Sequence, residues 1–151
     1  MKVPDEVRAL LAGRPEAGAW DPIFPLLTVD AAGFPHVCLL GRAELAVDAE
    51  RVFAVLASAT TIANLRRTGR ATLLVIGSST GLYCKMSLAG APLERDGLIG
   101  FEFTTAEVKY DSAGVDLLCA RFRVDAGLMA SERWQDSAAL LAELAGRAAD
   151  G

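Results

Sequence analysis

The chain has 151 residues and a formal net charge of −4, with 52% hydrophobic and 23% charged residues. This length suits one domain with its own core, and the composition excludes disordered and fibrous classes. The acidic balance argues against a nucleic-acid partner, because phosphate backbones attract strongly basic surfaces. We therefore expect residues 1–151 to form a single domain that binds no nucleic acid.

The start of the chain, MKVPDEVRALLAGRP, contains acidic residues and no long apolar core, unlike a secretory signal. Unbroken apolar stretches are only a few residues long, whereas a membrane-spanning helix needs about 20. These features predict a cytoplasmic protein without a membrane partner. Three widely spaced cysteines and a single histidine, His36, provide no ligand set of metal-site spacing. We therefore expect no metal.

The first half of the chain predicts two short helices and three strands. Apolar residues recur at helical spacing near the start, and Gly33 and Pro35 mark a turn between two apolar strands. A third apolar strand precedes a helix that stops at Gly69. The predicted elements are a helix at 5–13, strands at 24–30, 36–47 and 49–58, and a helix at 60–69.

The second half predicts four further strands and a C-terminal helix. Apolar residues change parity between Phe103 and Ala106, which indicates a β-bulge near Thr104–Thr105. The predicted elements are strands at 70–78, 78–94, 98–110 and 114–125, the last two as a hairpin around 111–114, and an amphipathic helix at 131–151. Tight turns indicate antiparallel pairing, and about seven strands in so short a chain indicate a barrel.

Four short motifs in order carry a resemblance to a known family. They are Thr28-Val29-Asp30, Gly33-Phe34-Pro35, Asn64-Leu65 and Arg70-Ala71-Thr72-Leu73. Their order and spacing resemble the pyridoxamine 5′-phosphate oxidase-like family of FMN-binding split β-barrels. The resemblance implies a mainly β (α+β) split barrel of six to seven antiparallel strands, with short flanking helices and a C-terminal helix. It also implies a homodimer that holds FMN at the subunit interface.

The stretch SATTIANLRR is the main candidate site for the cofactor phosphate. Ser58, Thr60 and Thr61 precede a helix start, whose free amides and dipole attract anions, and Asn64 would orient the loop. The alternative is that these hydroxyls only cap the helix. Family members carry an Arg/Lys pair where Thr60 and Thr61 stand. We therefore expect modest affinity, assisted by Arg42 or by a cation from the second subunit.

Two more candidates follow from the resemblance. His36 stands where many members carry an arginine at the start of the second strand, and Lys85 where oxidase members use a glutamine near the flavin ring. A cation there would stabilise the reduced ring. The alternatives are a turn residue for His36 and a solvated strand lysine for Lys85. No residue stands out as a catalytic acid or base.

The leading hypothesis is a flavin-binding protein that uses FMN as an oxidoreductase on an unknown small molecule. The missing Arg/Lys pair favours the alternative, a dimer of the same fold that binds a small ligand without FMN. A third hypothesis is another cofactor, such as a deazaflavin or haem. The sequence leaves the substrate and the electron donor open.

Overall fold

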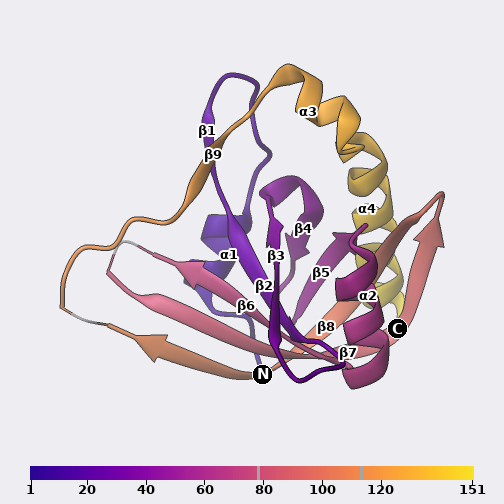
Figure 1. The fold of residues 1–151 in the computed structure, drawn as a ribbon, viewed down its shortest axis with the longest axis horizontal. Coiled ribbons are helices and arrows are strands. Elements are labelled where there is room, and N and C mark those ends of the chain that lie inside the picture. The colour runs from indigo at the N-terminus through magenta and orange to yellow at the C-terminus, as the bar shows by residue number, and fades with distance from the viewer. Residues whose placement is uncertain (78, 113) are drawn as a thin grey trace.

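A computed structural model describes residues 1–77, 79–112 and 114–151 of the chain. Its main element is a seven-stranded antiparallel sheet that curls into an incomplete barrel (Figure 1). The strands are β2 (Phe24–Val29), β3 (Pro35–Leu40), β4 (Leu45–Val47), β5 (Arg51–Leu56), β6 (Arg70–Ile76), β7 (Gly81–Arg95) and β8 (Leu98–Asp111). Their order across the sheet is β3-β2-β6-β7-β8-β5-β4.

Helices and a small second sheet surround this barrel. The two-stranded sheet pairs β1 with β9, so it joins residues that lie about a hundred positions apart in the sequence. The remaining elements are α1 (Asp5–Leu11), β1 (Trp20–Pro22), a 3₁₀ turn η1 (Arg42–Glu44), α2 (Ala59–Thr68), β9 (Arg121–Arg123), α3 (Ala126–Ser131) and α4 (Trp134–Asp150).

The main core fills the inside of the curled sheet. Alternate residues of each strand point inward, as the two-residue period of a strand requires, and α1 and α2 close the barrel. The largest buried side chains of this core include Phe24, Leu26, Leu65, Leu73, Leu82, Phe101 and Phe103. The hydrophobic pattern of the strands therefore sets which face becomes the core.

Helix α4 covers part of the opposite face of the sheet. Leu140 and Leu144 pack there against Phe53 and Leu98. Gly100 allows the helix to approach closely, because a Cβ at this position would lie 2.5 Å from Cδ1 of Leu144. The helix thus covers β5 and the adjoining half of β8.

The outer face of β2 and β3 is not covered by any described element. Val29, Val37 and Leu39 alternate with inward-facing residues, and their side chains are 47%, 51% and 61% exposed. Contiguous exposed apolar surface of this kind marks an interaction site more often than a solvated face.

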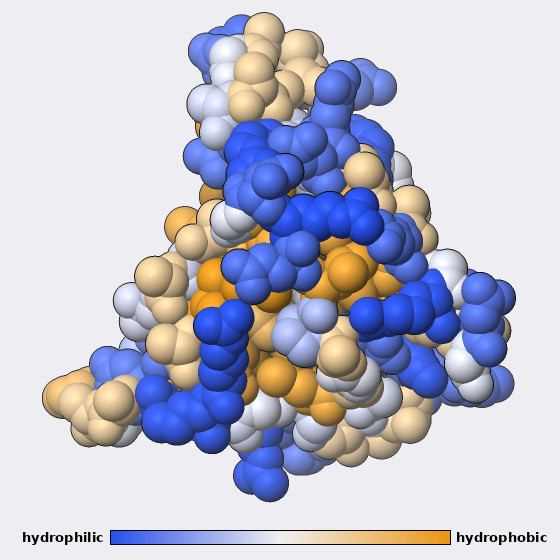
Figure 2. Space-filling model, turned by 90° about the vertical axis from the view of Figure 1, so that its right-hand side faces the viewer, coloured by the Kyte–Doolittle hydropathy of each residue, from blue (hydrophilic) through white to orange (hydrophobic). Residues whose placement is uncertain are grey.

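A second partly apolar surface lies on the side of the molecule that carries α2 and the β7–β8 turn. Figure 2 shows apolar side chains there, framed by hydrophilic ones. A groove of about 700 Å³ lies between α2 and this turn, with Ile62 and Ile99 in its lining and Arg66 and Glu94 beside them. Among the described residues, no helix combines the length and the apolar character needed to cross a membrane.

The predicted mainly β split barrel with flanking helices is confirmed, and seven strands form its main sheet. The predicted strand at 36–47 is wrong as a single unit. The chain leaves β3 at Leu40, turns through η1, and re-enters as β4 at the opposite edge of the sheet. This connection between the two edge strands, β3 and β4, accompanies the curling of the sheet around its core.

The predicted hairpin between 98–110 and 114–125 is also wrong. β7 pairs with β8 along most of its length and β5 pairs with Ile99–Thr104, but the later segment does not add to the remaining edge of β8. Only Arg121–Arg123 forms a strand, paired with β1, and Leu118 is 91% exposed.

One local prediction needs a small correction, and one is confirmed. The predicted helix at 131–151 begins three residues later, at Trp134, because Arg133 adopts a left-handed φ of 54° and separates α4 from the short helix α3. The β-bulge predicted near Thr104–Thr105 is confirmed: Lys85 pairs with Glu107 and Met86 with Thr105, which leaves Ala106 as the extra residue. Ser78 and Ala113, where the predicted strands at 70–78 and 78–94 meet and the predicted turn at 111–114 lies, are outside the described residues.

Candidate functional site

The hydroxyls at the start of α2 mostly bond within the helix end. The Oγ atom of Ser58 accepts hydrogen bonds from the backbone N–H of Thr61 at 3.4 Å and from its hydroxyl at 3.1 Å. The Thr61 side chain is fully buried, whereas Thr60 is exposed. Capping therefore uses two of the three hydroxyls, and Thr60 remains available to solvent.

Asn64 joins α2 to the neighbouring strand. Its side chain is 2% exposed, and its Nδ2 donates to the Thr28 hydroxyl at 3.0 Å. Arg67 donates to Oδ1 of Asn64 at 3.3 Å and to the carbonyl of Val29. Asn64 thus positions the helix on β2, and its amide is used inside the protein.

Two groups near the barrel core have raised pKa values, the Cys38 thiol and the Glu44 carboxyl. Burial raises the pKa of the Cys38 thiol; the nearby Thr61 hydroxyl opposes this shift and the Glu44 carboxylate adds to it. Burial also raises the pKa of Glu44 to about 7, although the Gly41 N–H opposes the shift.

His36 lies beside the strand residue that Asn64 contacts, whereas Arg42 is held in an ion pair. His36 is half-buried on β3, directly opposite Thr28 on β2. The Arg42 guanidinium pairs with buried Asp21, with Nη2 to Oδ1 at 2.6 Å, and it also donates to the carbonyl of Ala12. The Arg42 guanidinium is therefore already bonded to Asp21 and Ala12 within the protein.

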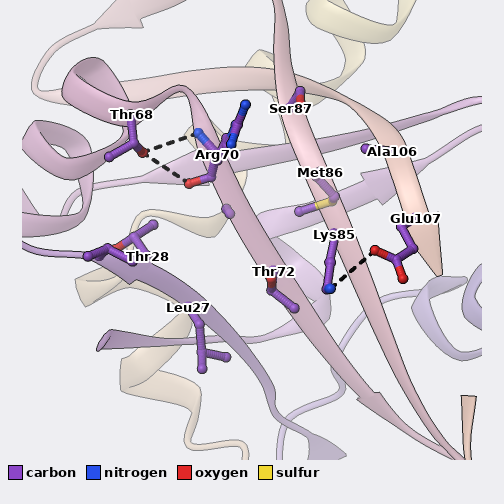
Figure 3. Close-up of a pocket in the computed structure, with 12 residues that line it drawn as sticks. Leu27, Thr28, Thr68, Arg70, Thr72, Lys85, Met86, Ser87, Ala106 and Glu107 are labelled. Atoms are coloured by element: carbon purple, nitrogen blue, oxygen red, sulfur yellow. Dashed lines mark hydrogen bonds and ion pairs between the residues drawn. The ribbon is translucent and has the colours of Figure 1, made fainter. Parts of the chain in front are cut away.

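Lys85 lies in a pocket on the outer face of β2, β6, β7 and β8 (Figure 3). We call this cavity of about 590 Å³ the outer-face pocket. Its lining residues are Leu27, Thr28, Val29, Thr68, Arg70, Ala71, Thr72, Lys85, Met86, Ser87, Ala106 and Glu107. The start of α2, with Ser58 and Thr60, is not among them, so of the predicted residues this pocket contains Lys85.

The register of the sheet explains which side chains meet in the outer-face pocket. Leu27, Thr72, Lys85 and Glu107 form one row across four strands, because each is paired with the next. The Lys85 ammonium lies 3.1 Å from the Glu107 carboxylate, and both side chains are about half exposed. The bulge at Ala106 places Glu107 in this row.

Sequence reasoning missed Arg70, Thr72, Ser87 and Glu107 as members of this site. Arg70 and Thr72 share one parity on their strand, as Lys85 and Ser87 do on theirs, which is a visible signal. The pairing register that places Arg70 opposite Ser87 is not visible in the sequence.

Nothing in the described residues provides a metal site. They contain no group of three or more His, Cys, Asp or Glu side chains placed to hold an ion. Cys38, Cys84 and Cys119 are free thiols. Burial raises the pKa of Cys84 to about 11, which makes this thiol a poor nucleophile.

No model of a known protein family matches the sequence, and no curated protein matches it. The fold, however, is a split β-barrel shared with solved structures of flavin proteins, so the predicted resemblance is confirmed at the level of fold. At identities of 13–16%, the similarity shows a common fold.

Three such structures are similar over most of the chain. An F420 reductase has 15% identity and a TM-score of 0.53, over 71% of this chain and 98% of its own. An FMN-binding protein from Syntrophomonas wolfei subsp. wolfei has 16% identity and a TM-score of 0.55, over 76% and 86%. A pyridoxinephosphate oxidase-family protein from Clostridium acetobutylicum, related to general stress protein 26, has 13% identity and a TM-score of 0.51, over 68% and 86%.

Proposed function

We propose that this chain is a flavin-binding protein that holds FMN in the outer-face pocket and acts as an oxidoreductase on a small molecule. The observation that carries the proposal is Lys85, a cation in a pocket lined on one side by Leu27 and Val29, within this fold. The cavity of about 590 Å³ also lies within the usual range of ligand sites, about 300–1,000 Å³.

The residues of the pocket fit a flat, partly polar ring. FMN, when bound, supplies the electron-transfer chemistry, and the protein supplies position and charge. Leu27 and Val29 offer apolar contact and exclude water from one face. Lys85 offers a positive charge to the ring edge that becomes negative on reduction. Glu107, at 3.1 Å, holds the ammonium in place before the ligand enters.

Replacing Lys85 tests this role. Lys85→Met should lower the midpoint potential of bound flavin by about 30–60 mV. A hydrogen bond from a charged group contributes about 1.5–3 kcal/mol, and 30 mV corresponds to about 1.4 kcal/mol in a two-electron couple. Potentiometric titration of the FMN-loaded protein measures the shift. Lys109→Met, on β8 but outside the pocket lining, is the matched control and should leave the potential unchanged.

Two results would contradict the assignment. Equal potentials in wild type and Lys85→Met would remove Lys85 from the site. A protein that takes up neither FMN nor riboflavin would favour the alternatives, and the similarity to an F420 reductase makes a deazaflavin the next cofactor to titrate. Haem, the other alternative cofactor, could take its axial ligand from His36, the chain's single histidine.

We also propose a homodimer in which a second copy covers the outer face of β2 and β3. Wild type should then have about twice the chain mass of 15.9 kDa by light scattering. Leu39→Lys should shift it to monomer, because a lysine at this 61% exposed apolar position would have to be desolvated. Met129→Lys, an exposed apolar position on α3, is the control. A monomeric wild type at micromolar concentration would overturn the dimer.

A further inference from the structure

Hydrogen bonds fix the backbone of Arg70, whereas its side chain is exposed to solvent. It follows Gly69, which ends α2 with a left-handed φ of 67°. The Thr68 hydroxyl accepts a hydrogen bond from the Arg70 N–H at 3.2 Å and lies 3.4 Å from its carbonyl oxygen (Figure 3). The side chain is exposed at the edge of the outer-face pocket. The end of α2 therefore fixes the backbone position from which the Arg70 side chain extends.

The two cations of the pocket, Arg70 and Lys85, differ in whether a carboxylate is paired with them. Lys85 is paired with Glu107 at 3.1 Å. Arg70 takes part in none of the ion pairs found among residues 1–77, 79–112 and 114–151, whereas Arg42 and Arg51 each hold a buried carboxylate. The pocket thus carries a net positive charge located at Arg70.

A hydroxyl lies directly across from this cation. Ser87 on β7 is paired with Arg70 on β6, and the next pair on the same face of the sheet, two residues along, is Thr72–Lys85. A strand rises about 3.3 Å per residue, so the two pairs are separated by roughly 7 Å. One end of the pocket therefore offers a guanidinium and a hydroxyl, and its centre offers an ion pair.

We propose that Arg70 and Ser87 form an anion subsite of the outer-face pocket, which takes the phosphate or carboxylate group of the bound small molecule. A guanidinium binds such groups through two parallel hydrogen bonds. The identity of the ligand rests on the proposed function, since the same pocket would hold the flavin. The anion is either the phosphate of FMN itself or the acidic group of a second molecule.

The start of α2 is the competing location. It has the Ser58 and Thr60 hydroxyls, but the Ser58 oxygen already caps the helix by accepting from Thr61. The ten residues of α2 also separate it from Arg70 by about 15 Å. A phosphate in the outer-face pocket is therefore better served by Arg70.

Titration with FMN and riboflavin, which differ only by the phosphate, tests the subsite. Wild type should prefer FMN by roughly ten- to hundredfold, the range expected for charge-assisted hydrogen bonds. Arg70→Met should lose this preference, Arg70→Lys should keep part of it, and Ser87→Ala should reduce it. Arg66→Met removes the same charge from the exposed face of α2 and should change nothing. Thr60→Ala, which tests the competing location, should also change nothing.

A second arm adds inorganic phosphate and follows its ³¹P line width with wild type and Arg70→Met. If the FMN preference is independent of Arg70, but phosphate binding to FMN-loaded protein requires Arg70, the anion belongs to a second molecule. If no flavin binds and phosphate binding still requires Arg70, the proposed function fails and the subsite stands. If neither the FMN preference nor phosphate binding depends on Arg70, or both depend on Thr60, the subsite is overturned.

Discussion

Asp21→Ala is expected to destabilise the fold by about 1.5–3 kcal/mol, the contribution of a hydrogen bond to a charged group, because Asp21 is buried while Arg42 keeps partial contact with solvent. Asp21 is 3% exposed, and its two carboxylate oxygens accept from Nε of Arg42 at 3.2 Å. Arg42 also donates to the carbonyls of Ala12 and Arg14. Loss of the carboxylate leaves this charge without a counterion where β1 meets the loop after α1.

Urea unfolding of the variants measures the effect, and a double-mutant cycle isolates the pair. Asp21→Ala combined with Arg42→Met should cost clearly less than the sum of the two single changes. Asp5→Ala is the matched control, because its pair with Arg8 is solvent-exposed and should contribute at most about 1 kcal/mol. An Asp21→Ala cost as small as that of Asp5→Ala would show that the buried pair does not stabilise the fold.

Glu44 is expected to make stability fall as the pH rises from about 4.5 to 7. Burial raises the pKa of its carboxyl to about 7 from the usual 4.5, and the nearby Glu132 adds to the rise. Below pH 4.5 the group is protonated in both folded and unfolded chains and contributes nothing. Between the two pKa values only the unfolded chain releases the proton, so unfolding becomes more favourable. The full cost, up to about 3 kcal/mol, is present above pH 7.

Glu44→Gln keeps an acceptor for the Gly41 N–H at this position and removes the charge. The variant should match wild type near pH 4.5 and exceed its unfolding free energy by up to about 3 kcal/mol at pH 8. Glu50→Gln, at an exposed turn position, should follow wild type at every pH. A constant difference between Glu44→Gln and wild type across this range would refute the raised pKa.

Helix α2 shows what local sequence signals can predict and what they cannot. Ser58 ahead of the helix and Gly69 after it are recognisable caps, and the structure uses both in this way. The same local pattern also suggested a phosphate site at Ser58, Thr60, Thr61 and Asn64. Burial of Thr61 and Asn64 depends on the packing of α2 against β2 and β3, which no local pattern specifies.

The outer-face pocket depends on pairings between distant strands. Lys85 was a candidate only through the family resemblance, and nothing local linked it to Arg70, fifteen positions earlier. The register that aligns Thr72 with Lys85, and Lys85 with Glu107, includes a bulge at Ala106. A shift of one residue would turn each of these side chains to the other face of the sheet.

The sequence by itself determined the mainly β class, the positions of most strands, the short helix α2 and the antiparallel pairing of strands joined by tight turns. These follow from two-residue periodicity, caps and turn residues, which act over a few neighbouring positions. Only the tertiary structure decided that residues 36–47 connect opposite edges of the sheet, that β9 pairs with β1, and that Arg70 lies opposite Ser87. Such choices depend on which edges are already occupied and on how the whole sheet closes around its core, and no short segment carries that information.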